Sequence, residues 1–264
     1  HTNGNAGYGM INEANSNPNL TDCTFSWNSA TAEGGGMYNS SSSNPTLTSC
    51  IFSRNDGSGM YNSASNPTLI NCEFDRNNGS GMKNYDSSNP TLTNCTFSRN
   101  TPSDKGGGIF NSSDSHPTLT YCTFNENSAN NGGGIYNEGN LKAINCTFRK
   151  NSANNYGGGI YNYDNSRAVL MDCTFSENTA KRGSGIYNKQ SDPNLIDCMF
   201  SGNTAHDRGG GIFNENSSPT LTGCTFSKNR GNVCGGMYNQ IDSDPILIDC
   251  QFIENLSGGM YNYK

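Results

Sequence analysis

The sequence predicts an all-β solenoid, in which short coils of chain stack on one another, and three recurring phrases carry this prediction. The first phrase, Cys-x-Phe-x-x-Asn, occurs ten times, with 22 to 27 residues from one copy to the next. The second, Gly-(Met/Ile)-x-Asn, occurs eleven times, and the third, Pro-Thr-Leu-Thr, is clear at 45–48, 90–93, 117–120 and 219–222. A period of this length is typical of proteins whose repeat is one coil.

Each phrase is expected to form one short strand, which gives three strands per coil. Leu lies three residues before Cys in nine coils, so the two side chains cannot both point inward from one straight strand, and the chain must bend between them. Stacked coils then form three parallel sheets around a thin core. Because parallel crossovers are right-handed, we predict a right-handed single-stranded parallel β-helix of about ten coils, forming a single domain over residues 1–264.

The glycine of the second phrase is present in every copy. A glycine of this kind indicates either a positive φ or a close approach of two backbones.

The Cys, Phe and Asn of the first phrase are expected to point inward in continuous columns. Stacked Asn amides can hydrogen-bond to one another along the axis of a parallel stack, which would satisfy these buried polar groups. We therefore assign them a structural role rather than a role in ligand binding. The residues chosen to represent this ladder are Cys50, Phe52, Asn55, Cys122, Phe124, Asn127, Cys173, Phe175 and Asn178.

The chain contains eleven cysteines, ten of them in the first phrase. A column of buried free thiols is the favoured interpretation, with pairing of some neighbours as an alternative. A metal site is not expected, because metal-binding cysteines converge on a point whereas these form a line. Cys234 lies outside the column. It is the candidate for an intermolecular disulfide, although a surface or half-buried thiol is favoured.

Composition excludes several classes of function. Only 31% of residues are hydrophobic, but they recur at fixed positions, which favours a packed column over disorder. The net charge of −6 leaves no basic stripe for a nucleic acid. No apolar run approaches the length of a membrane span. The abundance of Asn, Ser and Thr favours an extracellular or cell-surface location.

The paired phrases resemble the repeats of chlamydial polymorphic outer membrane proteins and related bacterial surface proteins. Phe124–Asn125–Glu126–Asn127, followed by Gly133–Gly134–Ile135, is typical of that pattern, and the resemblance covers the whole chain. It implies a β-helical passenger displayed outside the cell and often linked to adhesion. Two departures from that family are expected: no β-barrel anchor, and Cys and Tyr columns of unusual regularity.

No catalytic residue, metal ligand or cofactor is predicted. β-Helical lyases and hydrolases need clustered carboxylates or basic residues in a groove roofed by long loops, and here the carboxylates are scattered. The densest titratable group is His206–Asp207–Arg208, which we interpret as a solvated turn.

An aromatic residue follows Met or Ile in nine of the eleven copies of the second phrase, and alternation predicts that it points outward. Such a stripe could be an interaction face for packing or for glycans, or it could simply stabilise the sheet by side-chain stacking. Between the first phrase and the next glycine the turn is short in three coils and longer in the rest, where charges gather. The stripe residues are Tyr38, Tyr61, Phe110, Tyr136, Tyr161, Tyr187, Phe213, Tyr238 and Tyr261.

The leading functional hypothesis is an extracellular structural protein, a β-helical rod that stacks head-to-tail into a filament. No polar cap is visible at either end, so the expected partner is another copy of the chain. A surface adhesin or glycan-binding passenger, with glycans or a host surface as partner, is the alternative. Ice binding is the third and least favoured hypothesis: it rests on outward Thr pairs such as Thr46 and Thr48, whose column is interrupted in several coils.

Overall fold

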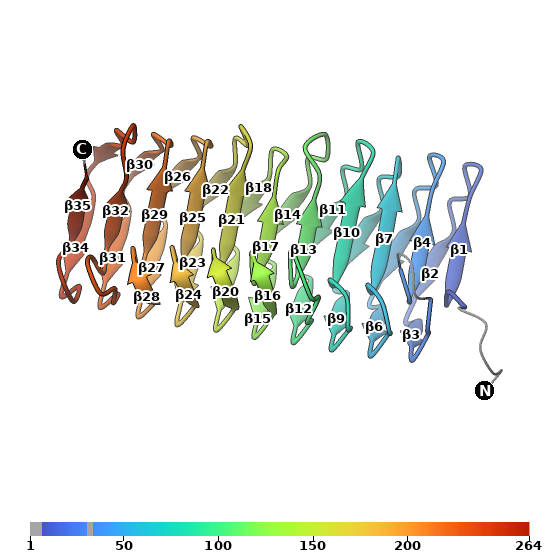
Figure 1. Cartoon of the computed structure of the whole chain (residues 1–264). Coiled ribbons are helices and arrows are strands. Elements are labelled where there is room, and N and C mark those ends of the chain that lie inside the picture. The colour runs from blue at the N-terminus through green and yellow to red at the C-terminus, as the bar shows by residue number, and fades with distance from the viewer. Residues whose placement is uncertain (1–6, 31–33, 264) are drawn as a thin grey trace.

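A computed structural model, which describes residues 7–30 and 34–263, forms a straight rod of stacked coils (Figure 1). The first and last coils lie at its two ends. Each coil contributes one strand to each of three long parallel sheets, here named A, B and C. The predicted solenoid with three strands per coil is therefore confirmed.

The strands of each sheet are in register from coil to coil, as shown by the pairs Asn84↔Asn111, Leu92↔Leu119 and Phe97↔Phe124. Sheet A comprises β1 Met10–Asn12, β4 Met37–Asn39, β7 Met60–Ser63, β10 Met82–Tyr85, β13 Ile109–Asn111, β17 Ile135–Asn137, β21 Ile160–Tyr163, β25 Ile186–Lys189, β29 Ile212–Glu215, β32 Met237–Asn239 and β35 Met260–Asn262. Sheet B comprises β2 Asn19–Thr21, β5 Thr46–Thr48, β8 Thr68–Ile70, β11 Thr91–Thr93, β14 Thr118–Thr120, β18 Lys142–Ile144, β22 Val169–Met171, β26 Asn194–Ile196, β30 Thr220–Thr222 and β33 Ile246–Ile248. Sheet C comprises β3 Thr24–Ser26, β6 Ile51–Ser53, β9 Glu73–Asp75, β12 Thr96–Ser98, β15 Thr123–Asn125, β19 Thr147–Arg149, β23 Thr174–Ser176, β27 Met199–Ser201, β31 Thr225–Ser227 and β34 Gln251–Ile253.

The bend predicted between Leu and Cys is a single residue with positive φ. Asn94 has a φ of 53° and joins β11 to β12, and Ser49 takes the same conformation between β5 and β6. Asn and Asp are common at this position because their short polar side chains tolerate the left-handed region. A second corner follows sheet C at the residue before the ladder Asn, for example at Arg99 with a φ of 52°.

Close backbone approach, rather than a positive φ, explains the recurrent glycine of the second phrase. A Cβ atom on Gly36 would lie 2.3 Å from the carbonyl oxygen of Gly59 in the next coil and 2.9 Å from Cδ1 of Phe52. Since neither neighbour is free to move, a side chain has no room at this corner.

The core is a set of columns parallel to the axis. Met or Ile, Leu, Cys and Phe of the interior coils are fully buried. Successive Phe rings of the first phrase stack with centroids 4.6 to 4.9 Å apart and nearly parallel planes. This interval is the rise from one coil to the next.

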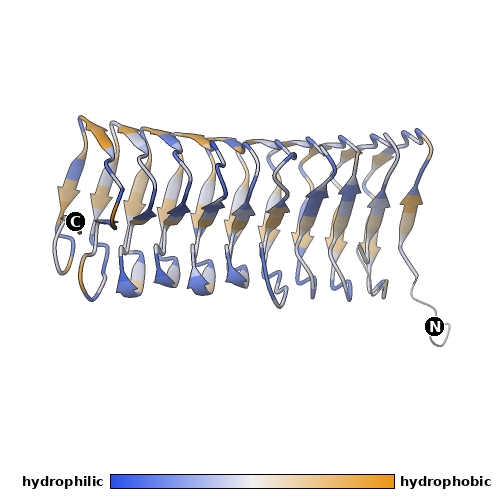
Figure 2. Ribbon diagram, turned by 45° about the horizontal axis from the view of Figure 1, so that its top comes forward, coloured by the Kyte–Doolittle hydropathy of each residue, from blue (hydrophilic) through white to orange (hydrophobic). Residues whose placement is uncertain are grey.

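A fourth, shorter sheet was not predicted. Sheet D is formed by the longer turns of four successive coils, and its strands are largely hydrophilic (Figure 2). Each of these turns nevertheless buries one alanine. The strands are β16 Ser128–Asn131, β20 Ser152–Tyr156, β24 Thr179–Arg182 and β28 Thr204–Arg208, and the alanines are Ala129, Ala153, Ala180 and Ala205.

Candidate functional site

The buried asparagines form two hydrogen-bonded ladders along the rod. In the ladder of the first phrase, Nδ2 of Asn127 donates to Oδ1 of Asn151 at 3.0 Å and to the carbonyl oxygen of Phe97 at 2.9 Å. Its Oδ1 accepts from the backbone N–H and from Nδ2 of Asn100, at 3.1 and 3.0 Å. The same pattern repeats in neighbouring coils, so the predicted asparagine ladder is confirmed.

The second ladder joins the asparagines of the second phrase, as from Asn84 to Asn111 at 2.7 Å. Its members are buried from Asn12 through Asn239. Both ladders keep the amides occupied with one another and with backbone groups, which leaves them little capacity to bind a ligand.

The ten cysteines of the first phrase form one straight column of free thiols. Every Sγ lies 3.3 to 3.5 Å from the carbonyl oxygen of the residue two positions earlier. From Cys50 onward each also lies 3.5 to 3.8 Å from the Leu, or Ala143, carbonyl oxygen of the preceding coil. The thiols therefore have equivalent surroundings and repeat with the coils.

Neighbouring thiols of the column influence one another. Contact with the S–H of Cys95 lowers the pKa of the Cys72 thiol to about 7, although burial opposes this. The pKa of Cys95 is raised by its contacts with Cys122 and Cys72. One ionised thiol is thus stabilised by neighbours that stay protonated.

Cys234 is fully buried, which contradicts the expectation of a surface or half-buried thiol and removes it as a candidate for an intermolecular disulfide. Its Sγ lies 3.2 Å from the carbonyl oxygen of Met237, and burial raises the pKa of the thiol. It packs in the aromatic cluster described next.

The aromatic stripe does not form a continuous exposed face, so that part of the prediction is wrong. Tyr38 and Tyr61 are half-buried and Tyr261 is 43% exposed. The other six stripe residues are buried, with exposures of 7% or less: Phe110, Tyr136, Tyr161, Tyr187, Phe213 and Tyr238.

Sheet D and the turns beside it supply the cover over the buried part of the stripe. Tyr156 of β20 contacts the ring of Tyr187, with centroids 4.6 Å apart. The guanidinium of Arg182 lies 5.6 Å from the ring centroid of Phe213, and that of Arg208 lies 5.2 Å from Tyr238. Stacking of the rings themselves, the structural interpretation of the stripe, is present along most of it.

Asp207 lies in β28 rather than in a solvated turn, which corrects the prediction for residues 206–208. Its Oδ2 accepts from Nε of Arg182 in the preceding coil at 2.7 Å, and its Oδ1 lies 3.4 Å from Nε of Arg208. The carboxylate therefore links the long turn that contains β24 to the one that contains β28.

An unpredicted ionic cluster lies at the C-terminal ends of two neighbouring interior strands of sheet A, β25 and β29. The hydroxyl of Tyr187 donates to Oε2 of Glu215, and Nζ of Lys189 lies 2.9 Å from Oε1 of the same carboxylate. Burial works against ionisation of Glu215, but the bonds from Tyr187 and Lys189 outweigh it and hold its pKa below the ordinary value. Burial, with the Glu215 contact, raises the pKa of Tyr187. The sequence could have indicated this ion pair, because Lys189 and Glu215 occupy equivalent positions in successive coils and are therefore paired in the sheet.

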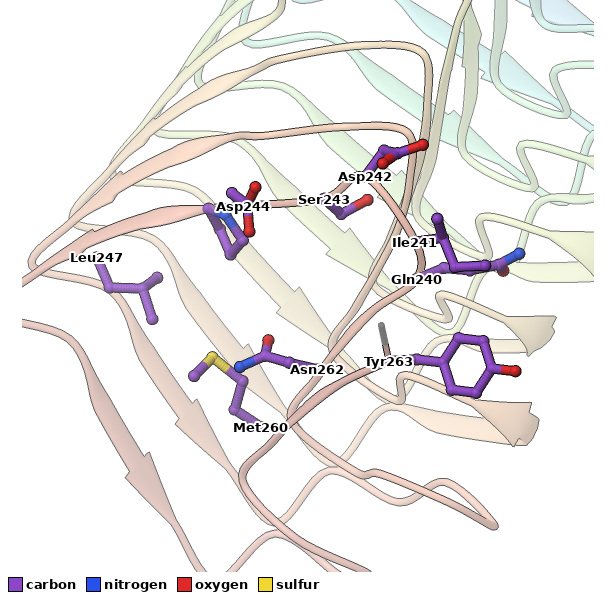
Figure 3. A pocket seen from close by; sticks show the side chains of 10 residues that line it. Gln240, Ile241, Asp242, Ser243, Asp244, Leu247, Met260, Asn262 and Tyr263 are labelled. Atoms are coloured by element: carbon purple, nitrogen blue, oxygen red, sulfur yellow. The ribbon is translucent and has the colours of Figure 1, made fainter.

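The surface of the described residues includes a larger and a smaller hollow. The larger, of about 540 Å³, lies at the end of the rod beyond β33, where Met260 and Asn262 face Leu247 and Asp244 across it (Figure 3). The smaller, of about 120 Å³, lies where the cover over the stripe begins. It is lined by Lys83, Tyr85, Pro102, Ser103, Asp104, Lys105 and Phe110.

Within residues 7–30 and 34–263, no three His, Cys, Asp or Glu side chains gather around one point as in a metal site with three or more ligands. The same part of the chain contains no helix with the length and apolar character needed to cross a bilayer.

Comparison with known proteins bears on the fold. The family model described as the right-handed β-helix region matches the chain twice, over residues 7–155 and 134–264, which together span nearly all of it. No curated protein matched the sequence. The handedness predicted from the crossover rule agrees with this match, whereas the finer resemblance to chlamydial surface proteins finds no support in a specific relative. The three in-register sheets and the family match together establish that the chain belongs to the right-handed β-helix family.

Proposed function

We propose that the protein is an extracellular structural rod whose copies stack end to end. The observation that carries this proposal is the register of the sheets. Met237 pairs with Met260 in sheet A just as Met10 pairs with Met37, and equivalent pairs recur in every coil. Each coil therefore offers the same set of ladders to the next, which favours continuation of the sheets from one copy to another.

The end coils supply apolar groups for such a contact. Met260 and Tyr261 are each 43% exposed at one end, and Ile11 is 51% exposed at the other. Within residues 7–30 and 34–263, β1 and β35 are the outermost strands of sheet A, and their outer edges present backbone donors and acceptors of the kind that template strand addition. A heterologous contact of this type does not close on itself and produces a filament.

The strand count adds a condition to the junction between two copies of this chain. Sheet A has eleven strands, whereas sheets B and C have ten. For β2 and β3 of one copy to continue directly from β33 and β34 of another, β1 and β35 would have to share one position.

Electron microscopy of the purified chain tests the proposal. Ten coils at about 4.8 Å predict filaments with an axial repeat of roughly 48 Å. Tyr261→Asp, which places a charge at the junction, should reduce filament length, while Tyr121→Asp, on an exposed corner between sheets B and C, should not. Uniform single rods at high protein concentration, for the unaltered chain, would contradict end-to-end assembly.

A surface adhesin that binds glycans is the second candidate, and one observation favours it. Tyr38 and Tyr61 are half-buried and stack with centroids 5.5 Å apart, and Tyr61 stacks in turn on Tyr85, which lines the smaller hollow together with Asp104 and Lys105. Partly exposed aromatic rings beside charged groups suit sugar rings and their hydroxyls. Glycan-array binding that is lost in Tyr38→Ala, with no filaments formed, would favour the adhesin.

A further inference from the structure

The cysteine column is a row of regularly spaced free thiols, which could bind metal ions in addition to packing in the core. It holds ten thiols, the eleven of the chain less Cys234. Their repeated contacts to backbone carbonyls give them one orientation, so successive sulfur atoms repeat at about the rise of the coils, 4.6 to 4.9 Å for the adjoining Phe rings. The column therefore contains nine gaps between neighbouring sulfurs.

We propose that this column binds soft monovalent metal ions, copper(I) or silver(I), with one ion between each pair of neighbouring cysteine sulfurs. Soft thiolates select ions of this type, and such ions accept two thiolates in a line. Two metal–sulfur bonds of roughly 2.3 Å, the length found for zinc thiolates, span roughly 4.6 Å. The rise of the coils thus matches linear coordination, whereas a tetrahedral ion would need four ligands around one point.

Charge balance favours a filled column. Each thiol that binds gives up its proton, and each bridging ion brings one positive charge. Nine ions between ten thiolates leave one net negative charge, and retention of the proton on one end thiol leaves none. The alternation of thiol and metal therefore avoids the unpaired buried charge that a single thiolate would create.

The hydrogen bonds that the thiols would lose on binding a metal ion are weak. Each Sγ of the interior column lies 3.3 to 3.8 Å from two backbone carbonyl oxygens, and an S–H group is a weak donor. Cys23 and Cys250 at the two ends are partly exposed, while the interior thiols are buried. Ions are therefore expected to enter from the ends and to fill the interior slowly.

The test is an oxygen-free titration of the folded chain with silver(I) nitrate, followed by native mass spectrometry and by near-ultraviolet thiolate-to-metal absorption. The intact column should retain up to nine ions. Cys122→Ala removes two gaps and should retain seven. Cys234→Ala removes a buried thiol outside the column and is the matched control, for which nine ions are expected.

Circular dichroism must show that the β-structure persists in each loaded protein. If Cys122→Ala does not fold, Cys72→Ala, which also removes two gaps, replaces it. Three results would overturn the proposal: no retained silver, retention of at most one ion at each open end, or equal numbers of ions in Cys122→Ala and Cys234→Ala. Loss of the β-signal on loading would overturn it as well, because the thiols would then bind only in an unfolded chain.

Discussion

Replacement of Asn127 by Leu tests the asparagine ladder at its centre. The side chain of Asn127 takes part in four hydrogen bonds, two as donor and two as acceptor, with Asn100, Asn151 and Phe97. Leu has a similar size but can make none of them. The substitution also leaves the backbone N–H of Asn100 without its acceptor in a fully buried position.

The expected loss of stability follows from those bonds. At a net contribution of about 1 kcal/mol each, four bonds amount to ~4 kcal/mol. Burial of the added apolar surface of Leu returns roughly 1 kcal/mol. The net destabilisation is therefore about 3 kcal/mol, which for an m value of ~3 kcal/mol/M lowers the urea midpoint by about 1 M.

Urea unfolding followed by circular dichroism measures the effect, and Asn125→Leu is the matched control. Asn125 lies two residues earlier on β15, with its side chain on the outer face of sheet C. Its replacement should shift the midpoint by no more than a few tenths of a molar unit, in line with surface substitutions. A midpoint for Asn127→Leu equal to that of Asn125→Leu would refute the ladder as a source of stability.

Two further substitutions test other features. Gly36→Ala should destabilise the rod more than Gly202→Ala in thermal unfolding. A Cβ at Gly36 collides with the carbonyl of Gly59, whereas Gly202 has open space around it and its replacement costs only the strain of a side chain at a φ of 63°. Equal effects would refute close approach as the cause. Glu215→Gln tests the bond from Tyr187: since folding depresses the pKa of Glu215, its contribution is present above the unfolded pKa of about 4.3 and is lost as pH falls through the folded value. The variant should be less stable by roughly 1 kcal/mol at pH 7, allowing for partial solvent contact, and the difference should shrink as the pH falls through the folded pKa of Glu215; a difference that does not shrink in acid would contradict this.

The repeated phrases were sufficient to predict the three sheets, the inward columns and the bend before Cys, because each coil faces the same constraints as its neighbours. Local alternation could not predict what lies over the outward side chains. Tyr187 points away from the Met/Ile core, as expected, but Tyr156 of β20 covers it, and Arg182 of β24 covers the neighbouring Phe213. Burial here depends on a turn that packs back on its own sheet, which strand periodicity does not describe.

A signal for sheet D was nevertheless present. The ladder Asn is followed by Ser-Ala at Asn127 and Asn151, and by Thr-Ala at Asn178 and Asn203. A small apolar residue recurring within turns of otherwise polar character indicates a second buried row. The burial of Cys234 was harder to predict, because its turn lacks the Ser-Ala or Thr-Ala pair of the sheet D turns.

The direction of the hydrogen bonds gives the rod unequal mechanical strength in different directions. Ladder and sheet bonds run along the axis, so tension between the two ends loads all the bonds of one junction together. A force that lifts one strand sideways from an end coil breaks the same hydrogen bonds one after another, so a much smaller force is enough to separate the coils. Sheet D adds bonds on one side only, between β16 and β28, which makes bending away from that side harder than bending in the perpendicular plane.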